Sequence, residues 1–153
     1  MSQEQVLVVD DEEVMRDVLG RVLGQAGYEV TFAENGPEGL ELARKGGYAA
    51  AIVDVMLPEM GGLEVLEELK KHDPEMVVLM ITAFASMEMA IAAIKKGAFY
   101  FVPKPFDNQQ LLHILSSGLL QRRLEEENRQ LRTALRDQGR FMELVGKSPK
   151  MLQ

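Results

Sequence analysis

Acidic residues close two separate apolar runs in this chain of 153 residues. Residues 6–9 are apolar and precede Asp10 and Asp11, and residues 49–53 are apolar and precede Asp54 and a loop with proline and glycine. Such a run predicts a strand that is buried on both faces and whose last residue points out of the sheet. Asp54 taken alone is equally compatible with a strand cap or the start of a turn. The repeated pattern favours a shared site, because two such strands side by side bring the three carboxylates together.

The chemistry of this site follows from its charges. Three adjacent carboxylates repel one another, so either one of them takes a proton or a cation binds. The chain has no cysteine and neither histidine is close to a predicted strand end, so oxygen ligands favour Mg2+ or Mn2+ over zinc. Thr82 and Lys104 lie at two further strand ends, and a hydroxyl and an ammonium beside a metal are what phosphoryl transfer requires. Asp54 would then be the nucleophile that carries an acyl phosphate.

The elements that must position these residues alternate along the chain. Apolar runs predict strands, and helical periodicity with caps predicts helices. The predicted strands are 6–10, 29–33, 49–54, 76–82 and 100–102; the predicted helices are 12–26, 37–45, 61–72, 86–96 and one that begins at Asp107. Five strand and helix units with short connections predict a doubly wound α/β fold, a parallel sheet covered by helices on both faces. In such folds ligands bind beyond the carboxyl ends of the strands, where the candidate residues lie.

Composition limits the possible functions. The chain is 46% hydrophobic and 27% charged, which suits one domain with an extension. Its net charge of -7 argues against a direct contact with nucleic acid, which needs clustered lysine and arginine. No apolar segment approaches the length of a membrane span, and the N-terminus lacks a signal-peptide pattern, so we expect a cytoplasmic protein without membrane contact.

Taken together, the acidic residues, Thr82 and the Lys104-Pro105 pair resemble the receiver domain of two-component response regulators, over residues 4–121. The resemblance implies a flavodoxin-like, CheY-like sheet with the strand order 2-1-3-4-5. It also implies that a sensor histidine kinase phosphorylates Asp54, that Asp11 binds Mg2+ directly, that Asp10 binds it mainly through water, and that the backbone carbonyl of Met56 completes the protein ligands.

The same resemblance assigns a switch. Thr82 and the N–H of Ala83 would bind the phosphoryl oxygens, Lys104 would pair with the phosphate, and the bond before Pro105 would be cis. Phe101 occupies the place of an aromatic switch residue that is tyrosine in many members. It can swing inward, but it has no hydroxyl with which to take part in the switch.

The predicted helix 86–96 carries more apolar residues than one buried stripe needs. Met87, Met89, Ile91 and Ile94 lie on it, and the surface made by this helix and the last strand would be repacked after phosphorylation. We expect most of these side chains to lie in the core and one or two to be exposed for a partner.

The last helix has no strong stop before Gly139 and is longer than the packing of a receiver requires. Leu124, Asn128, Leu131 and Leu135 are spaced as the seam of a coiled coil, and the asparagine would fix the register of a homodimer. The alternative is a single solvated helix. The spacing favours the dimer, although the seam is short.

The segment from Phe141 to Gln153 resembles the start of the AAA+ ATPase domain in sigma-54-dependent activators of the nitrogen-regulatory (NtrC) type. We therefore divide the chain into a receiver (1–121), a helical coiled-coil linker (122–138) and the start of a truncated AAA+ sigma-54-interaction domain (139–153). The resemblance implies an attached ATPase that acts on sigma-54 RNA polymerase, and a DNA-binding domain. Gly146-Lys147-Ser148 lacks the earlier glycine of a phosphate-binding loop, so this segment holds no ATP site of its own.

Two other functions remain open. An aspartate-nucleophile phosphohydrolase typically has a second acid two residues after the nucleophile, where this chain has Met56. A purely structural dimer module would take up no phosphoryl group and would not depend on a metal. We expect a regulatory phosphoacceptor, not an enzyme, whose only reactions are Mg-assisted self-phosphorylation and dephosphorylation.

Overall fold

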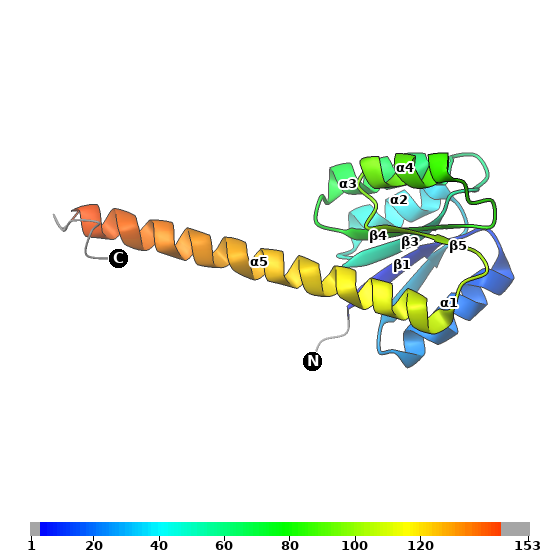
Figure 1. Ribbon diagram of the computed structural model, residues 1–153, viewed down its shortest axis with the longest axis horizontal. Coiled ribbons are helices and arrows are strands. Elements are labelled where there is room, and N and C mark those ends of the chain that lie inside the picture. The colour runs from blue at the N-terminus through cyan, green and yellow to red at the C-terminus, as the bar shows by residue number, and fades with distance from the viewer. Residues whose placement is uncertain (1–3, 145–153) are drawn as a thin grey trace. The chain divides into compact units, whose positions relative to one another are not determined.

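The computed structural model describes residues 4–144, with side chains described up to residue 137. Strands and helices alternate as β1 (Gln5–Val9), α1 (Glu13–Gln25), β2 (Glu29–Ala33), α2 (Gly36–Lys45), β3 (Ala50–Asp54), α3 (Gly62–His72), β4 (Val77–Thr82), α4 (Met87–Lys95), β5 (Tyr100–Pro103) and α5 (Asn108–Leu144). The five strands are all parallel in the order β2-β1-β3-β4-β5 (Figure 1). The predicted doubly wound fold and its strand order are therefore confirmed.

The sheet separates two apolar cores. On one side, alternate residues of β1, β3 and β4 pack under α2, α3 and α4, with Leu66 and Leu69 of α3 fully buried. On the other side, the remaining strand residues pack against α1 and the first turns of α5, where Leu111 and Leu115 are fully buried. A strand that is covered on both faces needs apolar residues at every position, which explains the unbroken apolar runs.

Polar side chains cap three of the helices. The Ser86 side chain accepts a hydrogen bond from the Met89 N–H at the start of α4, and Asp107 accepts one from the Gln109 N–H at the start of α5. Asn35 caps α2 in the same way, with Pro37 in the first turn. These bonds satisfy N–H groups that have no partner inside a helix.

The prediction that most apolar side chains of α4 lie in the core is wrong. Met87 is 79% exposed, and Ile91 and Ile94 are each 49% exposed. Met89 packs against the core from a partly buried position, and the buried residue of this helix is Ala93. The helix packs on the core through Ala93 and Met89, so Met87, Ile91 and Ile94 lie at the surface.

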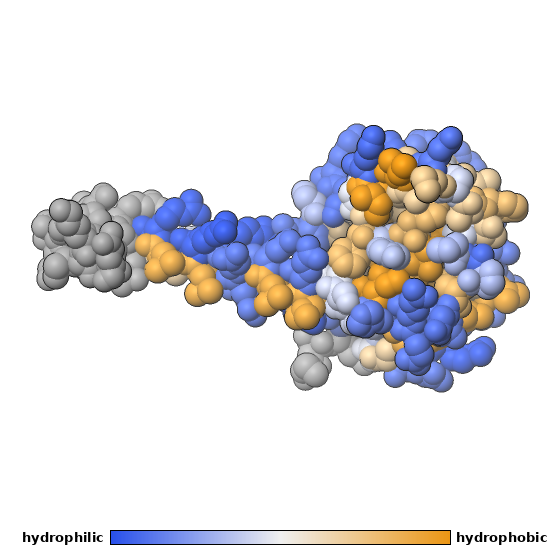
Figure 2. All heavy atoms as spheres, in the orientation of Figure 1, coloured by the Kyte–Doolittle hydropathy of each residue, from blue (hydrophilic) through white to orange (hydrophobic). Residues whose placement is uncertain are grey.

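The chain forms two compact units, residues 1–119 and residues 120–153, and each is described by itself. In the second unit, the described part is the helix α5 from residue 120 to Leu144. Apolar side chains gather along one side of it (Figure 2), and Leu120, Leu124, Leu131 and Leu135 are between 50% and 66% exposed. The helix continues through Gly139, where we had placed the end of the linker, because a single glycine costs a helix only about 1 kcal/mol. Residues 145–153, with Gly146-Lys147-Ser148, lie outside the described part.

Between residues 4 and 144, no helix combines the length and the apolar character that a crossing of the membrane would need.

Candidate functional site

The carboxyl ends of the parallel strands meet at one edge of the sheet. In the strand register Val9 pairs with Val53, Asp54 with Ile81, and Thr82 with Pro103. Asp10 follows β1 directly, Asp54 and Thr82 end their strands, and Lys104 follows β5. The structure therefore brings these four predicted residues to one place.

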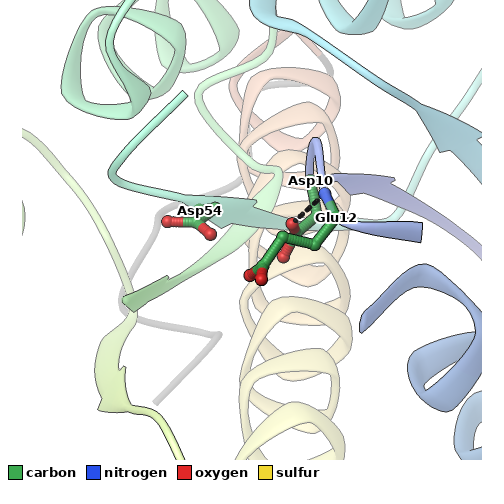
Figure 3. Close-up of side chains that lie close together, drawn as sticks. All are labelled: Asp10, Glu12 and Asp54. Atoms are coloured by element: carbon green, nitrogen blue, oxygen red, sulfur yellow. Dashed lines mark hydrogen bonds between the residues drawn. The ribbon is translucent and has the colours of Figure 1, made fainter. Parts of the chain in front are cut away.

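The carboxylates at this edge form a tight cluster. Oxygen atoms of Asp10, Glu12 and Asp54 all lie within 4.8 Å of one another (Figure 3). Asp10 is fully buried and Asp54 is 4% exposed, whereas Glu12 is exposed. Main-chain N–H groups hold the two buried acids in place, because the Glu12 N–H donates to Asp10 Oδ1 (2.9 Å) and the Met56 N–H donates to Asp54 Oδ1 (2.8 Å).

Lys104 lies among the three carboxylates. Its Nζ is 2.7 Å from Asp54 Oδ2, 3.1 Å from Glu12 Oε1 and 3.2 Å from Asp10 Oδ2, and its side chain is 7% exposed. Burial by itself lowers the pKa of this ammonium, but the hydrogen bond to Asp54 and the charges of Asp10 and Asp54 raise it more. The pKa of Lys104 is therefore raised, and the side chain is a fixed positive charge at the centre of the cluster.

The pKa of Asp10 is raised by its position in the cluster. Burial raises the pKa of its carboxyl group above the usual value, and the charge of Asp54 acts in the same direction. The hydrogen bond from the Glu12 N–H and the charge of Lys104 lower the pKa of Asp10 but do not outweigh burial. The site thus places a carboxylate where its ionised form is unfavourable unless further positive charge is present.

The donor set fits a hard divalent cation. Three carboxylates share one ammonium, which leaves an excess of negative charge, and all the side-chain donors are oxygen atoms. Mg2+ prefers such ligands and usually keeps several water molecules, so an open acidic cluster suits it. Asp11 is exposed and is not among the three clustered acids, so its role as a direct ligand, like that of the Met56 carbonyl, stays a prediction.

The predicted switch residues lie at the end of β4, in the loop that follows it, and on β5. Thr82 is fully buried; its hydroxyl oxygen accepts a hydrogen bond from the Phe84 N–H (3.2 Å), and its carbonyl accepts one from the Lys104 N–H (2.8 Å). Ala83 is exposed, and Phe101 is partly buried against the core. The Lys104–Pro105 peptide bond is cis, the isomer that the resemblance implies.

Sequence reasoning missed two features of the site. Glu12 was assigned to the start of a helix, although it is the third of four consecutive acids and its carboxylate contacts Lys104. Gly62 lies in the predicted helix 61–72, where its residue type carries no special role, but in the structure a Cβ atom there would clash with the carbonyl oxygen of Asp54. Only glycine lets the backbone come this close to the residue that ends β3. The Gly-Gly pair after the strand was the available signal.

Two curated relatives show the similarity in sequence. An uncharacterized transcriptional regulatory protein, YkoG of Bacillus subtilis, is 39% identical over 84% of this chain and 56% of its own length. The regulatory protein AtoC of Escherichia coli is 33% identical over 96% of this chain and 32% of its own length. The chain thus spans about a half and a third of these relatives.

Two solved structures show the similarity in fold. A CheY-like response regulator receiver domain protein from Methanospirillum hungatei superposes with a TM-score of 0.79 and 32% identity, covering 81% of this chain and 99% of that one. A response regulator from Burkholderia pseudomallei, solved with a phosphorylated aspartic acid, a calcium ion and citrate, has a TM-score of 0.71 and 32% identity, covering 81% of this chain and 73% of that one.

The family model of the response regulator receiver domain matches residues 6–116, well over half of the chain. This range begins within β1 and ends within α5, so it includes every residue of the acidic cluster and Lys104. With the parallel sheet and the clustered acids at its edge, this chain belongs to the response regulator receiver domain family.

Proposed function

We propose that this chain is the phosphoacceptor of a two-component response regulator and that Asp54 receives a phosphoryl group from a sensor histidine kinase. The observation that carries the proposal is the position of Asp54, whose carboxylate ends a buried strand within hydrogen-bond distance of Lys104 and beside two further acids. The related Burkholderia protein holds a phosphorylated aspartic acid and a divalent ion, which supports the same chemistry here.

In the proposed reaction, a carboxylate oxygen of Asp54 attacks phosphorus. The new P–O bond forms as the P–N bond to the histidine of the kinase breaks, and the electron pair of that bond stays on the imidazole. Asp10, Glu12 and Asp54 would hold the Mg2+ ion, with Asp11 and the Met56 carbonyl as the family pattern implies. When bound, Mg2+ neutralises charge on the phosphoryl oxygens. Lys104 then exchanges a carboxylate contact for a phosphoryl oxygen.

The switch begins at Thr82. Its hydroxyl accepts from the Phe84 N–H and retains a hydrogen atom that it can donate to a phosphoryl oxygen. A move of Thr82 toward the phosphoryl group would therefore pull on the loop that leads into α4. It would also open space for Phe101, which is packed only partly against the core.

The output surface of the proposed switch carries exposed apolar side chains. Phe84 is 70% exposed and Met87 is 79% exposed, and Ile91, Ile94 and Tyr100 are each 49% exposed. They belong to the loop after Thr82, to α4 and to β5, the strand that carries Phe101. Repacking of this surface would change the binding of a partner domain or of a second receiver.

We further propose that α5 beyond residue 121 forms a coiled-coil homodimer. Leu124, Leu131 and Leu135 are more than half exposed, and Asn128 is exposed between them. Burial of these leucines against a second helix would be favourable, because it removes apolar surface from water. Paired asparagines at the same seam favour one register. Glu127 and Arg132 flank the seam, five residues apart, and face each other with opposite charge when two helices run parallel and in register.

In the whole protein, phosphorylation would control an attached AAA+ ATPase that activates sigma-54-dependent transcription. The resemblance of residues 139–153 to the start of such a domain supports this, as does the match with AtoC, which is about three times as long as the matched region. The receiver would act by changing the arrangement of the dimer. DNA contact would belong to another domain, since this chain carries a net charge of -7.

The direct test is phosphorylation by acetyl phosphate with Mg2+, followed by intact-mass spectrometry. We expect the chain to gain one phosphoryl group, and Asp54→Asn and omission of Mg2+ each to abolish the gain. Asp17→Asn is the matched control, because Asp17 is an exposed aspartate of α1 outside the cluster. Undiminished labelling of Asp54→Asn, or steady release of phosphate without labelling, would contradict the proposal, and the second result would indicate a phosphohydrolase.

The regulatory part is tested by sedimentation equilibrium of residues 1–153 with Mg2+ alone and with Mg2+ plus beryllofluoride, which mimics a phosphoryl group on aspartate. A change in the association constant would support control through the dimer. A monomer under both conditions would contradict the coiled coil, and an unchanged dimer would mean that phosphorylation does not act on association.

A further inference from the structure

Arg16 joins three elements at the edge of the sheet near the acidic cluster. It lies in α1, and its side chain is only 15% exposed. One guanidinium nitrogen, Nη1, donates to the carbonyl oxygen of Asp10 (2.8 Å), and the other, Nη2, is 3.4 Å from Glu34 Oε1 in the loop after β2. The planar fork of arginine thus connects α1 with the end of β1 and with the loop between β2 and α2.

The Asp10 contact fixes the main chain of a residue in the cluster. The Asp10 N–H donates to the Ala33 carbonyl at the end of β2, and the Asp10 carbonyl accepts from Arg16. Both peptide groups that flank the Asp10 Cα are therefore held. The side chain of Asp10 leaves the main chain between these two bonds, so they set the direction from which its carboxylate enters the cluster.

The Glu34 contact holds the arginine itself. The Glu34 N–H donates to Glu38 Oε1 (2.9 Å), and the Glu38 N–H donates to Asn35 Oδ1 (2.9 Å), the cap of α2. Glu34 is mostly exposed, so its ion pair with Arg16 is weaker than the shorter bond from Arg16 to the buried carbonyl. Arg16 therefore acts mainly through Asp10, and Glu34 orients the guanidinium.

We propose that Arg16 is a positioning residue of the divalent metal site, acting through the main chain of Asp10. The inference rests on the proposed binding of Mg2+ to the cluster. Groups that hold metal ligands from behind typically change metal affinity 10- to 100-fold when they are removed. The arginine touches neither metal nor phosphoryl group, so its loss weakens metal binding without removing a ligand.

The test is a titration of residues 1–153 with Mn2+, in which electron paramagnetic resonance measures free Mn2+ and Mg2+ serves as competitor. We expect Arg16→Ala to raise the dissociation constant of both ions about 10-fold. Arg16→Lys should raise it about 3-fold, because an ammonium can reach the Asp10 carbonyl but cannot also hold Glu34. Glu34→Gln should change it less than about 2-fold.

The matched control is Lys70→Met. Lys70 Nζ donates to the carbonyl oxygens of Pro74 (2.7 Å) and Met76 (2.8 Å), so it also ties a loop together, but at the opposite ends of the strands. This variant is expected to lose stability with an unchanged metal dissociation constant. All titrations are made well below the melting temperature found by circular dichroism, so that loss of folded protein does not imitate loss of affinity.

The outcomes separate the two proposals. If the wild type binds neither Mn2+ nor Mg2+, the metal site itself is wrong, and the role of Arg16 falls with it. If the wild type binds and both folded Arg16 variants bind equally well, only the role of Arg16 is overturned. A Lys70→Met variant that weakens binding as much as Arg16→Lys would also overturn it, because general loss of stability would then explain both. Should Arg16→Ala fail to fold, Arg16→Lys decides.

Discussion

The acidic cluster of the first unit and the exposed leucines of the second, here called the stripe, both depart from the usual distribution of residues between surface and interior. They do so in opposite directions. In the cluster, charged groups are buried, with Asp10 and Asp54 at most 4% exposed. In the stripe, Leu124, Leu131 and Leu135 are between 55% and 66% exposed. Charges usually lie at the surface and leucines inside, because moving either the other way costs free energy.

The two regions call for different kinds of ligand. A buried excess of negative charge is relieved by cations, and its geometry is fixed by main-chain hydrogen bonds before any ion arrives. An exposed apolar stripe becomes buried when another apolar surface packs against it. This contact does not require side chains that hydrogen bonds have fixed in advance. The first region thus suits a small, hard ligand, and the second suits a large apolar partner. Substitutions should therefore affect ligand binding in one region and association in the other.

The largest effect of a substitution is expected on association through the stripe. Burial of a leucine side chain is worth about 2 kcal/mol, and Leu131→Ala removes two such side chains from a dimer. We expect the association constant from sedimentation equilibrium to fall about 1000-fold. Thr133→Ala, an exposed change two residues away, should leave it within a factor of about 2. Equal association of the two variants would mean that Leu131 does not lie in the interface.

The same substitution should behave differently when the stability of the first unit is measured. Because Leu131 is already exposed, its replacement should leave the free energy of unfolding of the first unit unchanged. Leu66→Ala, which empties a fully buried position in α3, should lower that free energy by about 3 kcal/mol in urea unfolding. A loss of receiver stability in Leu131→Ala would show that the two regions are not independent.

In the cluster, the corresponding change is Lys104→Met. It removes the positive charge shared by three carboxylates, and we expect the free energy of unfolding to fall by about 3 kcal/mol at pH 7 without Mg2+. The raised pKa of Lys104 means that its contribution is complete below the pKa of the unfolded chain and is lost as the pH rises through the folded value. The stabilities of wild type and variant should therefore converge only in strongly alkaline solution.

Mg2+ provides the control for this prediction. Since a divalent ion replaces the missing charge, Mg2+ should stabilise Lys104→Met more than it stabilises the wild type, as thermal unfolding at increasing Mg2+ would show. Lys45→Met, which removes an exposed partner of Glu41, should cost less than about 1 kcal/mol and show no such dependence. An Mg2+ effect of equal size in wild type and Lys104→Met would contradict the idea that ammonium and metal neutralise the same charges.

The sequence was sufficient for the fold because both faces of the sheet are covered. The apolar run at 49–53 has one explanation in a parallel sheet, and all of β3 is buried. The meeting of Asp10, Asp54, Thr82 and Lys104 follows from the same topology, because parallel strands end at one edge. The elements thus needed only apolar periodicity and helix caps, whereas the order of the strands in the sheet came from the resemblance to receiver domains.

Details that depend on a distance between two chain segments could not be predicted in this way. Gly62 matters because the start of α3 passes against the carbonyl of Asp54, and Glu12 because its side chain reaches Lys104 from another strand end. The exposure of Met87 on α4 depends on how closely a helix with small residues lies on the sheet. The pattern of apolar residues along the chain carries no information about these distances.

Asp10→Asn is expected to change the free energy of unfolding less than Lys104→Met does, and in the opposite direction. The raised pKa of Asp10 means that its favourable contribution is complete below the pKa of the unfolded chain and is lost as the pH rises through the folded value. At pH 7 the ionised carboxylate therefore costs stability, and the amide should raise the free energy of unfolding by about 1 kcal/mol. The gain should shrink in acid, and Mg2+ should no longer stabilise the variant. A loss of stability at pH 7 would show that the ion pair with Lys104 outweighs burial.

The smallest effect concerns the charges beside the stripe. In a parallel dimer in register, Glu127 of each helix faces Arg132 of the other, so Glu127→Arg places like charges together twice and should weaken association about 5-fold at low salt. Glu127→Arg with Arg132→Glu restores opposite charges and should recover most of the loss, whereas 0.5 M salt should reduce both effects. In an antiparallel pair these two residues do not face each other in this way, so the double variant would show no recovery. The comparison of single and double variants therefore measures the orientation of the helices, which the leucines alone leave open.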